Sequence, residues 1–482
     1  MVTLKSFWGT VGTYLDDRLV MDQDALAAKF SAAINWNASL YLFYKVAMTL
    51  LTLLFFRHLS THDFALWSNT SSITFLALLW IDSGLKKSIP RFALYFSASP
   101  TKFNTFLVRI ITYQSIILLG FTPIFYYGLR QFFLILGLSA STWIIGIATH
   151  LFVTEGLISL FRLIYHAYFW NRFFNLLITA SLLCEMFLDA VALLTPHTSS
   201  DLVYLILFNK MLCNAGVIFG SICILPFLKR TVIEFHAPTK NLWKSFAKHS
   251  ILLWGTTSLK SLSERNFLIP LLTYIIGPQI ANIFKLANDG ALLFQRTMLK
   301  TLGTADTSLL AHADHLPRKQ AEAFSLLYRT TISLCSILLG ILIFLSQTHL
   351  LGIILKSFTH IQKDPLIFTL FVILITGYFL EFLLLPYERF LEVKQRYRLL
   401  LQAYGIYTVG LIVFLLLLRR VHFLPLIAFL HSVKLITLGV MVYFVRKSYT
   451  IPHNIGYGIS WIASSTACAL VLSFIVNALL HH

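Results

Sequence analysis

Charged residues are scarce in this sequence. Asp, Glu, Lys and Arg make up 12% of the 482 residues, which is about half the share that soluble domains carry. Hydrophobic residues make up 57%, and the mean hydropathy is +0.76. A chain this long and this apolar cannot fold behind a single water-facing surface. The composition therefore excludes a soluble globular protein and predicts lipid as the surrounding medium.

Acidic residues are fewer than basic ones. The 38 Lys and Arg residues exceed the 20 Asp and Glu residues, which gives a formal net charge of +18. In a soluble protein this excess would suggest a nucleic-acid partner, but in a membrane protein Lys and Arg collect on cytoplasmic loops and near anionic lipid head groups. We therefore expect membrane lipids, and no nucleic acid, among the partners.

The short motifs that mark many catalytic sites are missing as well. The sequence contains no GxxxxGK[ST] nucleotide loop, no HExxH zinc helix and no GxSxG elbow. Its five cysteines lie in apolar stretches without paired spacing, as expected of small buried apolar residues, and its sixteen histidines form no metal-ligand pattern. The outer loops are too short to hold a catalytic domain. The sequence thus predicts no enzyme, no cofactor and no metal site.

Long apolar stretches, in contrast, recur along the whole chain. They run about 20 residues each, the length that a helix needs to cross the hydrocarbon core, whereas barrel strands would alternate in segments of about ten residues. We therefore expect an all-α polytopic membrane protein with about 12–14 transmembrane helices. The predicted spans are 35–56, 64–93, 103–127, 133–165, 173–194, 202–228, 246–272, 279–302, 323–346, 364–387, 399–418, 422–445 and 457–479.

A weak internal repeat divides the chain. Residues 55–79 and 272–296 occupy corresponding hairpins, the second about 217 residues after the first. The repeat predicts two pseudo-symmetric six-helix lobes that run in the same sense. The predicted parts are an interfacial N-terminal segment (1–34), an N-terminal lobe (35–228), a cytoplasmic linker (229–245), a C-terminal lobe (246–446) and an additional transmembrane helix with a tail (447–482).

Lys and Arg are distributed unequally over the connections. Those at 229–245, 303–322 and 388–398 carry many of them, whereas the connections on the other side carry few. Because positive residues stay in the cytoplasm, we expect these three connections and the N-terminus to be cytoplasmic. The odd number of spans then places His481 and His482 outside.

Ionisable residues also lie inside the predicted spans. A charge near the bilayer centre costs at least ~2.5–3.5 kcal/mol, so such residues usually line a cavity or pair with a partner. We take the cations as candidate substrate-binding residues and the acids as candidate charge-compensating or ion-coupling residues. The candidate cations are Lys210, Lys260, Arg265, Lys285, Arg296 and Lys434, and the candidate acids are Glu155, Glu264, Asp289 and Glu381; Glu185 and Asp189 lie in the fifth span without an assigned role.

The spacing of these residues groups several of them. Lys285, Asp289 and Arg296 share one helix face, and Lys260 lies one turn before Glu264. An Ile-Ile-Gly-Pro turn folds the seventh and eighth spans against each other and brings Glu264 to the level of Lys285 and Asp289. The sequence predicts a mixed, net-cationic surface at mid-membrane, where Glu264 and Asp289 compensate the lysines.

A structural role is the alternative for each of these charges. They can form ion pairs that only stabilise helix packing. Arg265 and Arg296 lie within reach of a helix end, so their side chains can also extend to the membrane interface.

Several segments resemble the polysaccharide flippase branch of the multidrug/oligosaccharidyl-lipid/polysaccharide exporter superfamily. WIDSGLKKSIPRFALYF, at the end of the second span, is similar to the branch's glycine-leucine pattern followed by arginine, here Gly84, Leu85 and Arg91. IIGPQIANIF is similar to its hairpin between spans seven and eight, through Gly277 and Pro278. Residues 155–177, 263–295, 304–331 and 349–360 resemble further parts of the branch in the same order.

This resemblance implies a fold, a substrate class and a location. The two six-helix lobes would surround a central cavity, and the protein would move a lipid-linked oligosaccharide from the cytoplasmic to the outer leaflet of a bacterial-type inner membrane by alternating access. We expect a monomer and a coupling ion, either a proton or sodium. Lys and Arg in such a cavity can hold the substrate's diphosphate by charge-assisted hydrogen bonds.

Two other functions stay open at this point. A drug exporter of the same superfamily would favour an acidic, aromatic cavity for organic cations, which the excess of Lys and Arg disfavours. A membrane scaffold that transports nothing is the third possibility.

Overall fold

The computed structural model describes the helical part of the chain in several stretches. These are residues 46–85, 100–167, 170–195, 197–225, 242–262, 265–302, 365–394, 396–417 and 423–448, with scattered residues at 43–44, 88–96, 324–344 and 460–471. Predictions that concern the connections at 229–241 and 303–322, the segment 349–360 and most of the last span fall outside these residues.

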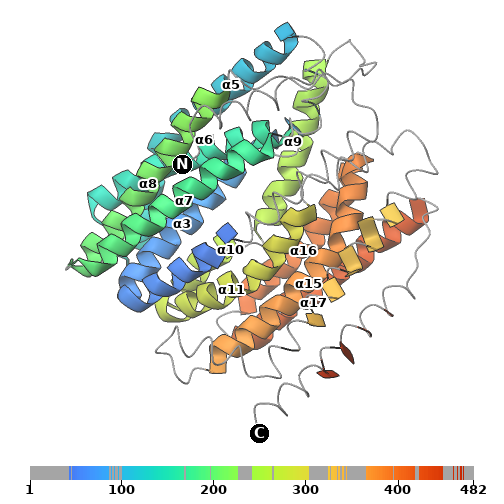
Figure 1. The fold of residues 1–482 in the computed structure, drawn as a ribbon. Coiled ribbons are helices and arrows are strands. Elements are labelled where there is room, and N and C mark those ends of the chain that lie inside the picture. Colours follow the sequence, from blue (N-terminus) through green and yellow to red (C-terminus); the bar gives the residue numbers. More distant parts are fainter. Residues whose placement is uncertain are drawn as a thin grey trace. The chain divides into compact units, whose positions relative to one another are not determined.

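The described part of the chain is helical and contains no strand (Figure 1). A short apolar helix, Val46–His58, comes first. The helices that follow are α3 (Thr61–Ile81), α5 (Pro100–Ile135), α6 (Thr142–Ala167), α7 (Asn171–Leu194), α8 (Ser199–Ile224), α9 (Leu242–Ser261), α10 (Arg265–Ile275), α11 (Pro278–Leu302), α15 (Pro365–Val393), α16 (Tyr397–Leu417) and α17 (Phe423–Ser448).

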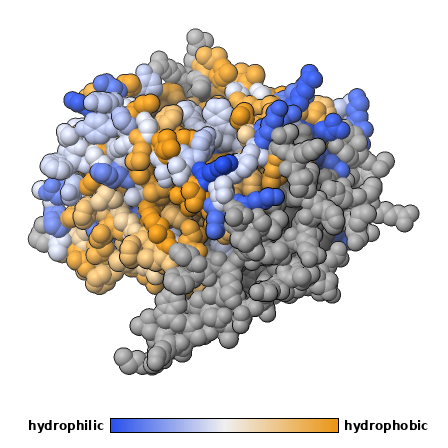
Figure 2. Space-filling view, turned by 90° about the horizontal axis from the view of Figure 1, so that it is seen from above, coloured by the Kyte–Doolittle hydropathy of each residue, from blue (hydrophilic) through white to orange (hydrophobic). Residues whose placement is uncertain are grey.

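Six of the described helices are long and apolar enough to cross a membrane. Their surfaces carry large apolar side chains that water would not favour: the exposed fraction is 65% for Ile116 on α5 and 68% for Phe187 on α7. Figure 2 shows such hydrophobic side chains, in orange, over broad areas of the face in view. Lipid is the solvent that suits these surfaces, and the predicted all-α, multi-pass integral membrane fold is confirmed.

The chain forms two compact units. The first contains Thr74–Thr257, and the second contains Leu42–Ile73 together with Ser258–His482. The units therefore do not follow chain order. The boundaries between them fall inside α3 and α9, so each of these helices is divided between the two units. The lobes predicted at 35–228 and 246–446 group the first hairpin differently and remain a prediction.

In the first unit, neighbouring helices pack through aromatic side chains. Contacts join α5 to α6, α6 to α8 and α7 to α8, and these helices lie side by side in Figure 1. Phe125 and Phe152 stack with ring centroids 4.4 Å apart. The buried Tyr165 hydroxyl donates to the Ser221 carbonyl over 2.9 Å and so connects α6 to α8.

A tight turn ends α3 in the first unit. Ser83 and Gly84 adopt left-handed φ angles of 50° and 77°, and a Cβ atom on Gly84 would lie 2.0 Å from the Ser250 carbonyl oxygen on α9. The Trp254 indole donates to the Trp80 carbonyl over 2.5 Å. Glycine is therefore required for the backbone of this turn to reach α9.

In the second unit, α11, α15, α16 and α17 form the core with α10. Contacts join α10 to α11, α11 to α15, and α15 and α16 to α17. Gly277, at φ 106°, forms the predicted turn between α10 and α11. Helix α11 begins at Pro278 and α3 at Thr61, so the two hairpins have the spacing of about 217 residues that the repeat predicts.

Several predicted spans have different ends in the structure: α3 ends at Ile81 and not at residue 93, and α5 continues to Ile135, where the sequence predicts a separate span from residue 133. The span at 246–272 is interrupted, because α9 ends at Ser261 and α10 begins at Arg265. The Ser261 hydroxyl donates to the Ser258 carbonyl and the Leu262 amide to the Leu259 carbonyl, and such local bonds tighten and end a helix. Helix α15 continues past the predicted end at residue 387 to Val393.

The five cysteines are free thiols, but not all are buried as predicted. Cys213 and Cys335 are buried, whereas Cys184, Cys223 and Cys468 are exposed. The apolar stretches in which they lie have lipid-facing sides as well as packed ones, and hydropathy does not distinguish the two.

Candidate functional site

The first unit contains an ion pair between two transmembrane helices. Lys210 of α8 lies 3.2 Å from Glu155 of α6. The Asn214 amide donates to Glu155 over 3.1 Å and to the Thr154 hydroxyl over 3.4 Å. The Lys210 ammonium also lies 5.5 Å from the centre of the Phe75 ring on α3. Two residues selected from the sequence, Glu155 and Lys210, are thus direct partners.

More acids surround this pair than the sequence analysis selected. Asp189 of α7 is fully buried and accepts a 3.0 Å hydrogen bond from Asn209. Glu185, one turn earlier, interacts electrostatically with Lys210 and Glu155. The four-residue spacing of Glu185 and Asp189 was the available signal that both face the same neighbour. Three acids and one lysine therefore form an acidic cluster in the first unit.

In the second unit, Lys285 and Asp289 form an ion pair along α11. Their charged atoms are 3.1 Å apart, and both side chains are nearly buried. The Lys285 ammonium also lies 4.8 Å from the centre of the Trp67 ring on α3. The predicted shared face is confirmed for these two residues, and a cation–π contact adds a partner that the sequence did not indicate.

Polar contacts between two hairpins bring Trp67 to this position. The Asn69 amide donates to the Thr273 hydroxyl over 3.1 Å, and the Asn282 amide donates to the Thr61 carbonyl over 2.9 Å. These bonds connect the first part of α3 to α10 and α11 within the second unit. Asn and Thr side chains that bond between helices are common contacts inside membranes.

Lys434 of α17 is connected to α11 through Tyr378 of α15. Its ammonium is 5.6 Å from the centre of the Tyr378 ring, and the Tyr378 hydroxyl donates to the side-chain oxygen of Asn288 on α11. Only 7% of Lys434 is exposed. Asn288 lies one turn after Lys285 on α11, so these contacts link two lysines, one aspartate and two aromatic rings, which we call the Lys285–Lys434 cluster; among its described side chains the lysines outnumber the acid.

Lys260 has a partner that was not selected from the sequence. Its ammonium lies 2.7 Å from Glu388 of α15, which is 3% exposed, and 5.8 Å from the centre of the Tyr404 ring. The hydropathy pattern placed Glu388 in a loop, because the predicted span ended at residue 387. Glu388 is therefore a buried acid that the hydropathy pattern concealed.

The structure does not describe the side chains of four residues that were selected from the sequence. Glu264 lies outside the described residues, and so do the side chains of Arg265, Arg296 and Glu381. Whether Glu264 compensates Lys285 remains a prediction.

Comparison with known proteins gives the fold a context. No protein-family model matches the sequence, and no curated protein matches it significantly. Among solved structures, the lipid II flippase MurJ in an inward closed conformation is similar with a TM-score of 0.62 and 15% identity, over 93% of this chain and 92% of that one. A MOP superfamily transporter from Pyrococcus furiosus has a TM-score of 0.61 and 13% identity, over 89% and 97%.

A third similar structure is an inward-facing multidrug resistance transporter of the MATE family. Its TM-score is 0.58 and its identity 12%, over 89% of this chain and 95% of that one. This transporter and the one from Pyrococcus furiosus both belong to the MOP superfamily. The chain therefore has the fold of the MOP superfamily transporters.

Proposed function

We propose that this protein is a transporter that moves an anionic lipid-linked oligosaccharide from the cytoplasmic to the outer leaflet. The observation that carries the proposal is the Lys285–Lys434 cluster, where cations outnumber acids among the side chains that the structure describes. The fold of the MOP superfamily transporters, and the similarity to a lipid II flippase, support transport as the activity.

The chemistry of the cluster suits a polyprenyl diphosphate head group. A diphosphate cannot enter hydrocarbon alone, because an unpaired charge there is strongly disfavoured. Lysine ammonium groups in a weakly hydrated site bind phosphate oxygens through charge-assisted hydrogen bonds. Trp67 and Tyr378, with the amide of Asn288, offer apolar faces and hydrogen-bonding groups that sugars can use.

The coupling ion belongs to the same proposal. The acids of the first unit, Glu155 and Asp189 among them, are candidates for taking up a proton or sodium during the transport cycle. We expect a monomer in a bacterial-type inner membrane, with its N-terminus in the cytoplasm.

Export of organic cations is the second candidate function. The acidic cluster of Glu155, Glu185 and Asp189 favours it, since acids in a membrane cavity attract cationic drugs, and the multidrug transporter of the MATE family is also similar in fold. The two candidates differ in which unit's charges contact the substrate, and this difference can be tested.

The test uses purified protein in proteoliposomes with two substrates, a fluorescent polyprenyl-diphosphate sugar and a fluorescent organic cation. Lys434→Ala should lower flipping of the lipid about 10–100-fold, as expected when a charged hydrogen bond is lost. Lys447→Ala is the matched control, because Lys447 is exposed near the end of the same helix. Transport of the organic cation alone, with loss in Glu155→Gln, would replace this proposal by drug export.

A cell-based experiment tests the same proposal without purification. Cells that lack the protein should accumulate a lipid-linked glycan on the inner leaflet, and wild-type protein should clear it while Lys434→Ala at equal abundance should not. A normal distribution of lipid-linked glycans in those cells would contradict flipping.

A further inference from the structure

Aromatic side chains gather in the first unit around the beginnings of α5 and α9. The ring centroids of Trp243 and Phe246, in the first turns of α9, lie 5.9 and 6.0 Å from that of Phe106 on α5. The ring of Trp170, just before α7, lies 6.5 Å from that of Phe103. Figure 1 shows the first turns of α5 and α9 at the same end of the unit. Trp is enriched where lipid head groups meet hydrocarbon, which indicates that this end lies at the level of the head groups.

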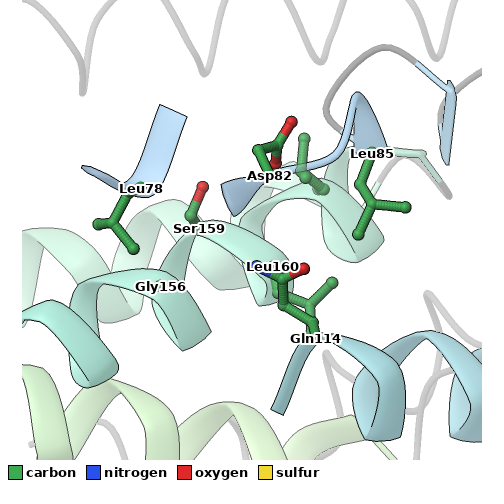
Figure 3. Close-up of a pocket in the computed structure, with 8 residues that line it drawn as sticks. Leu78, Asp82, Leu85, Gln114, Gly156, Ser159 and Leu160 are labelled. Atoms are coloured by element: carbon green, nitrogen blue, oxygen red, sulfur yellow. The ribbon is translucent and has the colours of Figure 1, made fainter. Parts of the chain in front are cut away.

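Helix α5 has a packed side and an exposed side in its first turns. The packed side carries the buried residues Phe106, Ile110 and Gln114, and Figure 3 shows Gln114 at a small hollow that residues of α3 and α6 also line. The exposed side carries Arg109 and, two turns further along, the exposed Ile116. On this side a cation near the beginning of the helix is thus followed by apolar surface that suits lipid.

Arg109 differs from the paired lysines Lys210, Lys260 and Lys285, because it has no carboxylate beside it. Its guanidinium lies 5.2 Å from the centre of the Trp243 ring, and it forms no ion pair within the described part of the chain. The sequences of α5 and α9 contain neither aspartate nor glutamate. An arginine two turns from a helix end can extend to the head-group level, where lipid phosphates are the available anions.

The exposed side of α9 has the same arrangement. Lys244 and Lys248 are exposed and lie one turn apart, and the exposed Ile251 follows them on the same helix face. Lys244 directly follows Trp243, whose ring the Arg109 guanidinium contacts. Both helices therefore present cations near their beginnings and apolar side chains further along.

We propose that Arg109, Trp243, Lys244 and Lys248 form a binding surface for an anionic phospholipid of the surrounding bilayer, which we call the α5–α9 surface. The lipid phosphate accepts charge-assisted hydrogen bonds from the guanidinium and ammonium groups. The acyl chains lie along the apolar surface that continues from the cations, over the exposed isoleucines of both helices. Because the cations adjoin this apolar surface, the occupant is a lipid and not a free phosphate. The proposal does not depend on what the protein transports.

Lipid binding can be measured on the purified full-length protein in nanodiscs of phosphatidylcholine with increasing amounts of phosphatidylglycerol. The readouts are the melting temperature and the phosphatidylglycerol that stays bound after detergent extraction, counted by native mass spectrometry. We expect phosphatidylglycerol to raise the melting temperature of the wild-type protein and to remain bound. A basic residue at an anionic surface contributes about fivefold in affinity. Arg109→Ala should therefore weaken binding about fivefold, and Lys244→Gln combined with Lys248→Gln about 25-fold.

Matched controls separate this surface from general effects of charge and stability. Arg130→Ala changes another exposed arginine of α5, near the other end of the helix, and should bind phosphatidylglycerol as the wild type does. Arg109→Lys keeps the charge and should retain most of the binding. Each variant is compared with itself in the two lipids, so a change in its intrinsic stability cancels. The lysine variant keeps the proposal testable if Arg109→Ala does not fold.

Three results would overturn the proposal. The first is a wild-type protein that melts at the same temperature in both lipids and retains no phosphatidylglycerol. The second is an equal loss of binding in Arg130→Ala and Arg109→Ala, which would show only a general attraction between the positive protein and the membrane. The third is tighter binding of the polyprenyl-diphosphate sugar than of phosphatidylglycerol, lost in Arg109→Ala, which would assign the surface to a transported lipid. None of these measurements requires that the protein flips a lipid.

Discussion

At the scale of single residues, the charges inside the membrane occur in partnerships. Lys210, Lys260 and Lys285 each have a carboxylate within 3.2 Å, and aromatic rings lie over all three. An ammonium group loses its hydration in this environment, and the carboxylate and ring replace part of it. The partnerships make insertion possible and also make each pair sensitive to loss of one member.

The Lys285–Asp289 pair allows a direct test of this sensitivity. Asp289→Ala should destabilise the protein by about 3–5 kcal/mol, because it leaves a buried lysine without its carboxylate. Adding Lys285→Ala should restore much of the folded protein without restoring transport. The measurement is a double-mutant cycle on melting temperature and membrane abundance.

The same cycle between Glu264 and Lys285 serves as the comparison, since the sequence predicts that pair as well. Purely additive effects of the Asp289 and Lys285 substitutions would show that the ion pair contributes nothing to stability.

Gly84 provides a second residue-scale prediction. Gly84→Ala places a Cβ atom 2.0 Å from the Ser250 carbonyl at a left-handed φ, so it should destabilise the protein by about 2–5 kcal/mol through strain and overpacking. Gly120→Ala on α5 is the control, because no atom lies within 4 Å of its added Cβ. Thermal unfolding of both variants should separate them clearly, and equal melting temperatures would contradict the close approach of α3 to α9.

At the scale of elements, small residues decide how closely helices pack. Lipid offers helices no hydrophobic reason to associate, so their contacts depend on close fitting. Gly410 on α16 lies against Val433 on α17, and Gly377 on α15 lies against His431. These glycines let α17 approach α15 and α16 and so hold Lys434 beside Tyr378.

Two glycines of α16 test this packing. Gly410→Ala brings its Cβ to 2.5 Å from a Val433 methyl group and should cost about 1–3 kcal/mol. Gly405→Ala, on the same helix with open space around it, should be neutral or slightly stabilising because alanine favours helix. The readout is the melting temperature in detergent. If Gly405→Ala proves the more harmful of the two, α16 and α17 pack through another face.

At the scale of the whole molecule, the distribution of Lys and Arg predicts which connections face the cytoplasm. A version without native cysteines can carry single cysteines at Ala311, in the connection that contains Arg318 and Lys319, and at Thr359, on the predicted outer side. In intact cells a membrane-impermeant thiol reagent should label Thr359→Cys and spare Ala311→Cys, because Lys-rich and Arg-rich connections stay inside. Permeabilised cells, where both should react, control for accessibility. The reverse pattern would invert the topology.

The sequence by itself determined the local features of this protein. Hydropathy located the membrane helices, glycine and proline marked the turn at Gly277, and the four-residue spacing predicted the contact of Lys285 with Asp289. Each of these depends on neighbours along one helix, whose geometry is the same in every protein.

Only the tertiary structure decided which distant residues meet. It paired Lys260 with Glu388, placed Trp67 over Lys285, and brought Asn209 to Asp189. It also grouped the first hairpin with the second unit and divided the seventh predicted span. Inside a membrane, lipid-facing and protein-facing sides are equally apolar. Hydropathy therefore cannot show which sides of two helices pack together, and contacts between distant helices follow from that packing.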